Sequence, residues 1–136
     1  PDPRVRIALA QRLEGADLMP FLADEAYEVR IAAARRAPPY ALVYLMHDPE
    51  PEVRRAVARR LPQPSLARMA HDADPLVRLT VAEHLDPERL APLAEDPDMR
   101  VRFAVAERIH PRFLPRLAED AVEPIAELAR TRLANA

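Results

Sequence analysis

The sequence predicts an all-α solenoid in which α-helices alternate with short 3₁₀ helices, built from about 5.7 repeats of 24 residues. The strongest observation is the dipeptide Val-Arg, which recurs every 24 residues without drift, and its valines are Val5, Val29, Val53, Val77 and Val101. Sixteen prolines against a single glycine indicate stiff connections between short helices, because hairpin turns need glycine. A repeat of this length cannot bury its apolar face alone, so neighbouring repeats must stack.

This period makes residues 1–136 one repeat array. With column 1 of a repeat placed at Pro1, the repeats are residues 1–24, 25–48, 49–72, 73–96 and 97–120, followed by a partial repeat 121–136. Since the sequence starts inside a repeat and not with methionine, we expect the array to be part of a longer chain.

Columns 4 to 13 of each repeat predict one α-helix. Columns 5, 8, 9 and 13 are small or apolar, which is the spacing of one helical face. An acidic residue at column 2 followed by proline at column 3, as in Asp74 and Pro75, is typical of a helix N-cap and first turn. Prolines at columns 14 and 15, such as Pro62 and Pro87, are expected to end the helix.

Columns 17 to 22 predict a second, shorter helical segment. There is room for only one or two tight turns, and apolar residues three positions apart at columns 18 and 21 suit a 3₁₀ or short α segment. Column 18 is leucine in every full repeat, at Leu18, Leu42, Leu66, Leu90 and Leu114.

The most specific polar feature is an aspartate at column 24 followed six residues later by an arginine at column 6. The pairs are Asp24 and Arg30, Asp48 and Arg54, Asp72 and Arg78, and Asp96 and Arg102. Because the aspartate precedes the helix and the arginine lies in its first turns, we expect the two to meet in a ladder, with the carboxylates also accepting turn amides. We interpret this ladder as structural, and a ligand-binding role requires it to be exposed.

Column 12 carries a second series of basic residues. They are Arg12, Arg36, Arg60, His84, Arg108 and Arg132. A cation in the last turn favours the carbonyl end of the helix dipole. Columns 6 and 12 together hold ten of the 20 arginines, so these side chains are predicted to be committed to structure.

Column 7 is the candidate partner surface. Its residues are Ile7, Ile31, Arg55, Leu79 and Phe103, roughly opposite the predicted core stripe. An exposed apolar stripe along a solenoid is a plausible protein-binding surface. The favoured alternative is that the column packs between neighbouring helices. For the tyrosines of the second repeat, Tyr27, Tyr40 and Tyr44, loop packing is favoured over an aromatic patch.

Charge argues against a general affinity for nucleic acid. The net charge is −2. The third repeat is +2, with five arginines against three acids, and the fourth is −4, with two arginines against six acids. Such differences in net charge between repeats are typical of a solvated surface. Nucleic-acid binding through surface arginines is kept as an alternative function.

No constellation in the sequence predicts catalysis or a metal site. The one serine, Ser65, has no partner motif, and Thr80 one turn before His84 lacks an orienting group and an oxyanion donor. His47 and His71 share column 23, but one repeat is too far apart for two ligands of one metal. We therefore predict a protein that is not an enzyme. The absence of a long apolar run predicts a cytoplasmic protein with no membrane partner.

The pattern D-P-x-V-R-x-A-V-A-x-R-L at a period of 24 resembles the leucine-rich repeat variant family over the whole chain, and more distantly HEAT repeats. That resemblance implies a right-handed superhelix and allows a 4Fe-4S cluster bound by an N-terminal cysteine cluster. The 136 residues contain no cysteine, so we expect no cofactor within this chain. The predicted function is a non-enzymatic scaffold that binds another protein. The alternatives are nucleic-acid binding and the repeat portion of an iron–sulfur protein whose cluster domain lies outside these residues.

Overall fold

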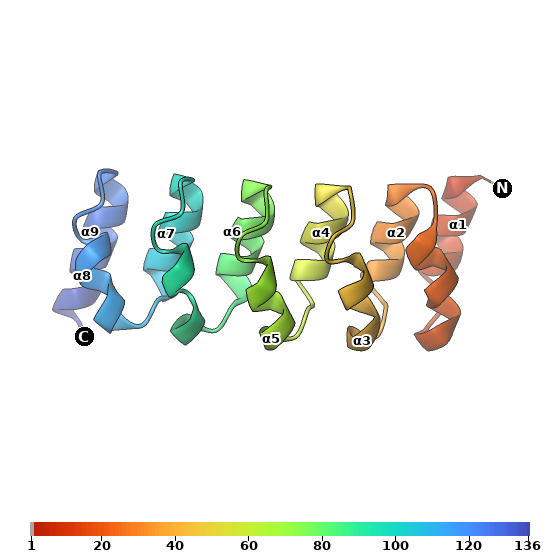
Figure 1. Ribbon diagram of the computed structural model, residues 1–136, viewed down its shortest axis with the longest axis horizontal. Helices are drawn as coiled ribbons and strands as arrows, with labels where there is room; N and C mark the ends of the chain where they lie inside the picture. Colours follow the sequence, from red (N-terminus) through yellow and green to blue (C-terminus); the bar gives the residue numbers. More distant parts are fainter. Residues whose placement is uncertain (1) are drawn as a thin grey trace. The chain divides into compact units, whose positions relative to one another are not determined.

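The structure, a computed structural model, describes residues 2–136 as α and 3₁₀ helices with no strand among them (Figure 1). These residues divide into two units, which meet in the sequence between Ser65 and Leu66. The same alternation of a longer helix and a short helical segment is present in each unit. The prediction of one unbroken array over residues 1–136 stays a prediction.

In the first unit, long helices alternate with short segments. The elements are α1 (Pro3–Ala10), η1 (Gly15–Ala23), α2 (Tyr27–Ala34), α3 (Pro39–Leu42), η2 (Val43–Leu45) and α4 (Pro51–Ala58), and α5 (Gln63–Leu66) spans the boundary of the units in the sequence. Helix α2 packs against both α1 and α4, so the three long helices form one layer (Figure 1). The short segments form the second layer, with η1 against α2 and η2 against α4.

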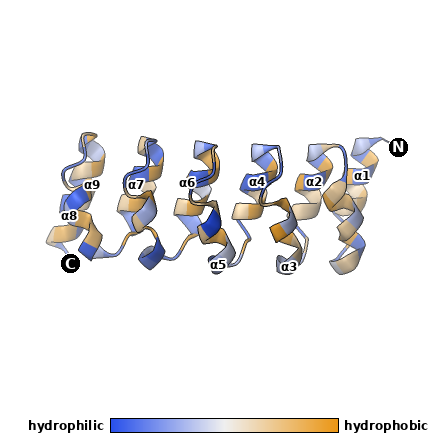
Figure 2. Ribbon diagram, viewed as in Figure 1, coloured by the Kyte–Doolittle hydropathy of each residue, from blue (hydrophilic) through white to orange (hydrophobic). Residues whose placement is uncertain are grey.

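The second unit repeats this arrangement. Its elements are η3 (Ala67–Met69), α6 (Pro75–His84), η4 (Pro87–Arg89), η5 (Ala91–Leu93), α7 (Met99–Arg108), η6 (Pro111–Phe113), α8 (Leu114–Leu117) and α9 (Glu123–Ala134). Helix α7 packs between α6 and α9, while η3, η5 and α8 pack against α6, α7 and α9 respectively. Each long helix combines hydrophilic and hydrophobic stretches, as expected where only one side is buried (Figure 2).

The long helices begin at column 3 of the repeat, one residue earlier than predicted. The Asp74 side chain accepts hydrogen bonds from the amides of Leu76 and Val77, and proline occupies the first turn. Asp98 caps α7 in the same way, and hydrogen bonds from the side chain and amide of Arg100 lower the pKa of Asp98 to about 2. These contacts satisfy amides that have no partner inside the helix.

The prolines of columns 14 and 15 do more than end a helix. Pro39, Pro87 and Pro111 are the first residues of α3, η4 and η6. A fixed φ suits the first helical position, where the missing amide proton costs no hydrogen bond. The same residues therefore end one helix and start the next segment.

Columns 5, 9 and 18 form the core that the period predicts. Val29, Val53, Val77 and Val101 of column 5 and all column 18 leucines except Leu66, at 1%, have no exposed surface. Column 10 is alanine from the first repeat to the fifth and is buried throughout, which lets backbones approach closely. On α1, by contrast, Val5 and Leu9 of columns 5 and 9 are 52% and 48% exposed.

Candidate functional site

Arg30, Arg78 and Arg102 each bind two aspartates in two different ways. The guanidinium of Arg30 forms a two-pronged ion pair with the carboxylate of Asp48, with Nε–Oδ2 and Nη2–Oδ1 distances of 2.8 and 3.0 Å. Its Nη1 donates to the backbone carbonyl of Asp24 at 2.7 Å. The arginine therefore connects the turn before its helix to the turn at the end of its repeat.

The same geometry recurs in both units. Carboxylate pairs join Arg6 to Asp24, Arg78 to Asp96 and Arg102 to Asp120 at Nε–Oδ2 distances of 2.7 to 2.8 Å. Carbonyl contacts join Arg54 to Asp48, Arg78 to Asp72 and Arg102 to Asp96 at 2.7 to 2.9 Å.

The predicted pairing was therefore wrong in its atoms. Asp24 with Arg30, Asp48 with Arg54, Asp72 with Arg78 and Asp96 with Arg102 do meet, but through the carbonyl of the aspartate and not its carboxylate. The carboxylate that pairs with the guanidinium of Arg30 belongs to Asp48, 18 residues later in the sequence. In the partial repeat, the arginine position is filled by the buried Ala126.

The ladder is closed to ligands by its own contacts. Each carboxylate also accepts a hydrogen bond from the amide two residues on, at 2.9 Å from Asp48 to Glu50 for example. The side chains of Arg30 and Asp48 are only 12% and 4% exposed, and those of Arg78 and Asp96 are 13% and 4% exposed. Since all the oxygens and most donors are used within the fold, these residues hold turns together.

Two ladder carboxylates have a clearly lowered pKa. Hydrogen bonds from Arg6 hold the pKa of Asp24 below its ordinary value, and Arg102 does the same for the pKa of Asp120. Burial opposes the lowering in both cases, while the amide of the following turn adds to it. The ionised form is therefore the one that the folded chain stabilises.

We expect acid to destabilise the fold through these groups. Their folded pKa lies below the unfolded pKa, so their contribution is complete above about pH 5 and is lost as the pH falls through the folded pKa. The free energy of unfolding, measured by urea titration at constant ionic strength, should be flat from about pH 7 to about pH 5 and fall below about pH 4. The variant Asp24→Asn/Asp120→Asn should lose part of that dependence. A profile identical to that of the unmodified chain would contradict this role.

The column 12 arginines cap the helix of the preceding repeat. Arg60 donates to the carbonyls of Ala34 and Ala37 at 2.8 and 2.7 Å. Arg132 donates to those of Ala106 and Ile109 at 2.9 and 2.8 Å. The sequence hypothesis of a cation at its own helix end is corrected, because the acceptors are the last carbonyls of the neighbouring helix.

Two further arginines of column 12 make a similar contact, whereas Arg12 is exposed. Arg108 donates to Ala82 at 2.6 Å, and Arg36 donates to Leu13 at 3.0 Å. The Nδ1 atom of His84 lies 2.9 Å from the carbonyl of Thr80 on the same helix. These contacts join repeats within a unit, and sequence alone could not identify the carbonyl acceptors.

Column 7 lies beside two surface grooves, one in each unit. In the first unit, Ile31 and Arg55 line a groove of about 150 Å³ with Arg35, Glu52 and Arg59. In the second unit, Leu79 and Phe103 line a larger groove of about 290 Å³.

The candidate partner surface is therefore reachable from solvent. Ile7, Ile31, Arg55 and Leu79 are half-buried, and Phe103 is 39% exposed. Four of the five side chains are thus partly packed, in agreement with the favoured interpretation that the column lies between neighbouring helices, and Phe103 is the most exposed of the five.

The tyrosine prediction was wrong for two of the three residues. Tyr27 is half-buried, but Tyr40 and Tyr44 are 65% and 72% exposed, one turn apart on α3 and η2. They do not pack in a loop.

The structure does not assemble a catalytic pair from Thr80 and His84, and it places no metal-binding cluster within residues 2–136. The buried hydroxyl of Thr80 donates to the carbonyl of Leu76 at 3.0 Å, so it does not face His84 as a nucleophile. Across residues 2–136, no three histidine, aspartate or glutamate side chains are placed to hold a metal ion. Over the same residues, no helix is both long and apolar enough to cross a membrane.

Sequence reasoning missed one charge reversal. Column 11 is Arg35 and Arg59 in the first unit but Glu83 and Glu107 in the second. The reversal is visible in the sequence, but its meaning depends on these residues lining the two grooves.

Comparisons with known proteins agree with this architecture. The family model described as leucine rich repeat variant matches residues 27–50, 51–74 and 75–98, each match starting at column 3, where the long helix begins. A solved structure described as "a leucine-rich repeat variant with a novel repetitive protein structural motif" is 37% identical, with a TM-score of 0.91. The similarity covers 97% of this chain and 56% of that one, so this chain spans little more than half the length of that protein. No curated protein matches this chain.

Proposed function

This chain belongs to the leucine rich repeat variant family, and we propose that it is a non-enzymatic scaffold that binds another protein along an exposed face of its helices. The observation that carries the proposal is the apolar groove of the second unit, where Met99 and Phe103 are 55% and 39% exposed. Exposed apolar side chains grouped beside a groove are typical of interaction sites. The cytoplasmic location expected from the sequence is part of this proposal.

The contacts of the polar residues support a scaffold over a catalyst. A catalytic site repeated along the array would need the charged residues of columns 6, 12 and 24. In this structure, these arginines and aspartates instead form hydrogen bonds with each other and with backbone groups. The remaining surface has grooves and exposed apolar side chains, which are suited to recognition of a partner protein.

Nucleic-acid binding is the second candidate, and one feature of the first unit favours it. Arg35, Arg55 and Arg59 line one groove, and no carboxylate in residues 2–136 forms an ion pair with them. Three cations together fit a phosphate backbone. An iron–sulfur role of the whole protein needs cysteines that these 136 residues lack, so the array itself is not proposed to bind a cluster.

One experiment separates the two candidates. The purified chain is used to capture partners from a nuclease-treated extract of its own cells, and each retained protein is then purified and titrated against it by calorimetry. In parallel, labelled RNA and DNA are titrated at about 50 and about 300 mM salt. We expect a stoichiometric complex with a purified protein and weak nucleic-acid binding. Tight, salt-sensitive RNA or DNA binding with no protein complex would reject the scaffold.

A further inference from the structure

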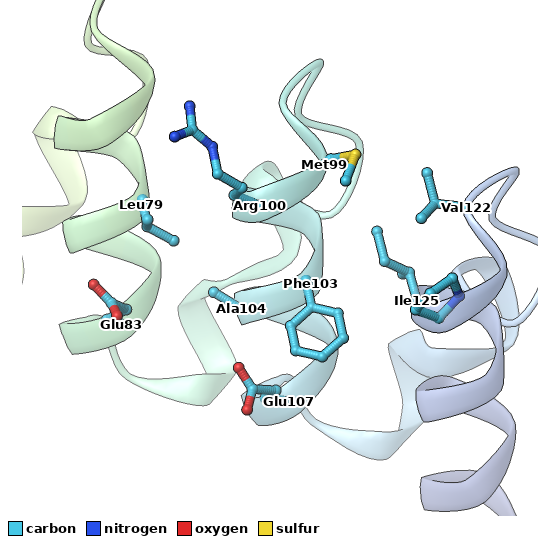
Figure 3. A pocket seen from close by; sticks show the side chains of 10 residues that line it. Leu79, Glu83, Met99, Arg100, Phe103, Ala104, Glu107, Val122 and Ile125 are labelled. Atoms are coloured by element: carbon cyan, nitrogen blue, oxygen red, sulfur yellow. The ribbon is translucent and has the colours of Figure 1, made fainter.

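Most of the residues that line the groove of the second unit are apolar. Leu79 reaches it from α6, Met99 and Phe103 lie on α7, and Ile125 closes it from α9 (Figure 3). Its volume of about 290 Å³ is at the lower end of the range for small-molecule sites. This size suits one or two anchoring side chains of a longer partner.

One end of the groove is acidic. Glu83 and Glu107 line it from α6 and α7, at the edge opposite Arg100 (Figure 3). Both glutamates are exposed, and nowhere in residues 2–136 does a cation pair with either. The guanidinium of Arg100 is already bound to Asp98 at 2.8 Å. The groove therefore presents two free negative charges beside apolar surface.

The first unit holds a natural control for this feature. Its groove has arginines at the positions of both glutamates, namely Arg35 for Glu83 and Arg59 for Glu107, and Arg55 in place of Phe103. The same backbone pattern thus carries the opposite charge and lacks the aromatic anchor. Fold requirements do not dictate the acidic, apolar character of the second groove.

We propose that this groove binds a basic amphipathic segment of a partner protein, with apolar side chains against Phe103 and Leu79 and lysine or arginine beside Glu83 and Glu107. Attraction between opposite charges speeds the encounter and sets the orientation of the partner segment in the groove. Its apolar side chains, buried against the groove, supply most of the affinity. Helical segments with apolar residues on one face commonly bind grooves between helices. This inference rests on the proposed scaffold function and adds the chemistry of the partner.

The test uses two labelled model peptides of about 16 residues, with leucines spaced for one helical face. The first carries lysine at all other positions, and the second carries glutamate there. Fluorescence anisotropy is measured with the full chain at about 50 and about 300 mM salt. We expect the lysine peptide to bind roughly tenfold or more tightly than the glutamate peptide, with the difference shrinking at the higher salt.

Three variants assign the binding to the groove. Phe103→Arg and Glu107→Arg install residues that the first unit already carries at these columns, so both should fold, which circular dichroism verifies. Each should weaken binding of the lysine peptide by roughly tenfold. Glu88→Arg makes the same charge change on exposed η4, outside the groove, where Arg112 occupies the equivalent position of the next repeat. It should leave binding within about twofold.

Equal binding of both peptides, or a Glu88→Arg effect as large as that of Glu107→Arg, would overturn the assignment. So would Phe103→Arg binding the lysine peptide as tightly as the unmodified chain. If the groove fails in this way while a purified protein still forms a stoichiometric complex, the scaffold function stands and only the groove is rejected.

Discussion

Replacing Asp48 with alanine is expected to lower the free energy of unfolding by about 3 kcal/mol. The change removes both hydrogen bonds to Arg30 and the acceptor for the amide of Glu50. It also leaves the guanidinium of Arg30, 12% exposed, without its anionic partner. An uncompensated cation in such a place costs more than the pair itself contributes. Urea unfolding followed by circular dichroism measures the loss.

Two further variants give this prediction its controls. Asp48→Asn keeps an oxygen for the turn amide but removes the charge, so it should cost less, about 2 kcal/mol. Asp17→Ala removes an exposed aspartate from η1 and should change the stability by no more than about 0.5 kcal/mol. If Asp48→Ala is as mild as Asp17→Ala, the ladder does not hold the turns.

Truncating a column 18 leucine should have an effect of similar or larger size. Leu42→Ala removes a side chain with no exposed surface, and we expect a loss of about 3 to 4 kcal/mol from the lost burial and the cavity that remains. The adjacent Val43, the first residue of η2, is 39% exposed, so Val43→Ala should cost less than about 1 kcal/mol. Equal effects of the two substitutions in urea unfolding would show that the short segments are not part of the core.

The period predicted the elements and the core well because both follow from local spacing. Val53 and Leu66 are buried as their columns require, and α and 3₁₀ segments alternate as the proline positions indicate. The helix range of columns 4 to 13 began one residue late, although Asp74 and Pro75 do occupy the cap and the first helical position, as their residue types predicted. These features depend on neighbours in the sequence, which a repeat pattern reports directly.

The partner of each ladder arginine could not be predicted from the same pattern. In a strict repeat, an aspartate six residues before Arg30 and one eighteen residues after it occupy the same column. Only the path of the chain decides which presents its carboxylate and which its carbonyl. The carbonyl acceptors of Arg60 could not be predicted for a related reason. Every residue has a backbone carbonyl, so the residue type does not indicate which carbonyl accepts the hydrogen bond.

The functional surface was only partly predictable. Phe103 was identified as a candidate from its column, but Glu83 was counted only in the acidic charge of the fourth repeat, and Glu107 was not singled out. Their arrangement around one groove depends on three helices packing side by side within the second unit. What distinguishes this site is its departure from the repeat, since the first unit carries arginine at the same columns.

We infer that the repeated charges hold the fold together and that the non-repeated surface serves recognition. The sharpest test is a double-mutant cycle, with Arg30→Met, Asp48→Asn and the double variant compared in urea unfolding. We predict a coupling free energy of about 2 kcal/mol between the two side chains, with unchanged affinity for the lysine peptide. A coupling below about 0.5 kcal/mol, or a loss of peptide binding in these variants, would contradict the claim.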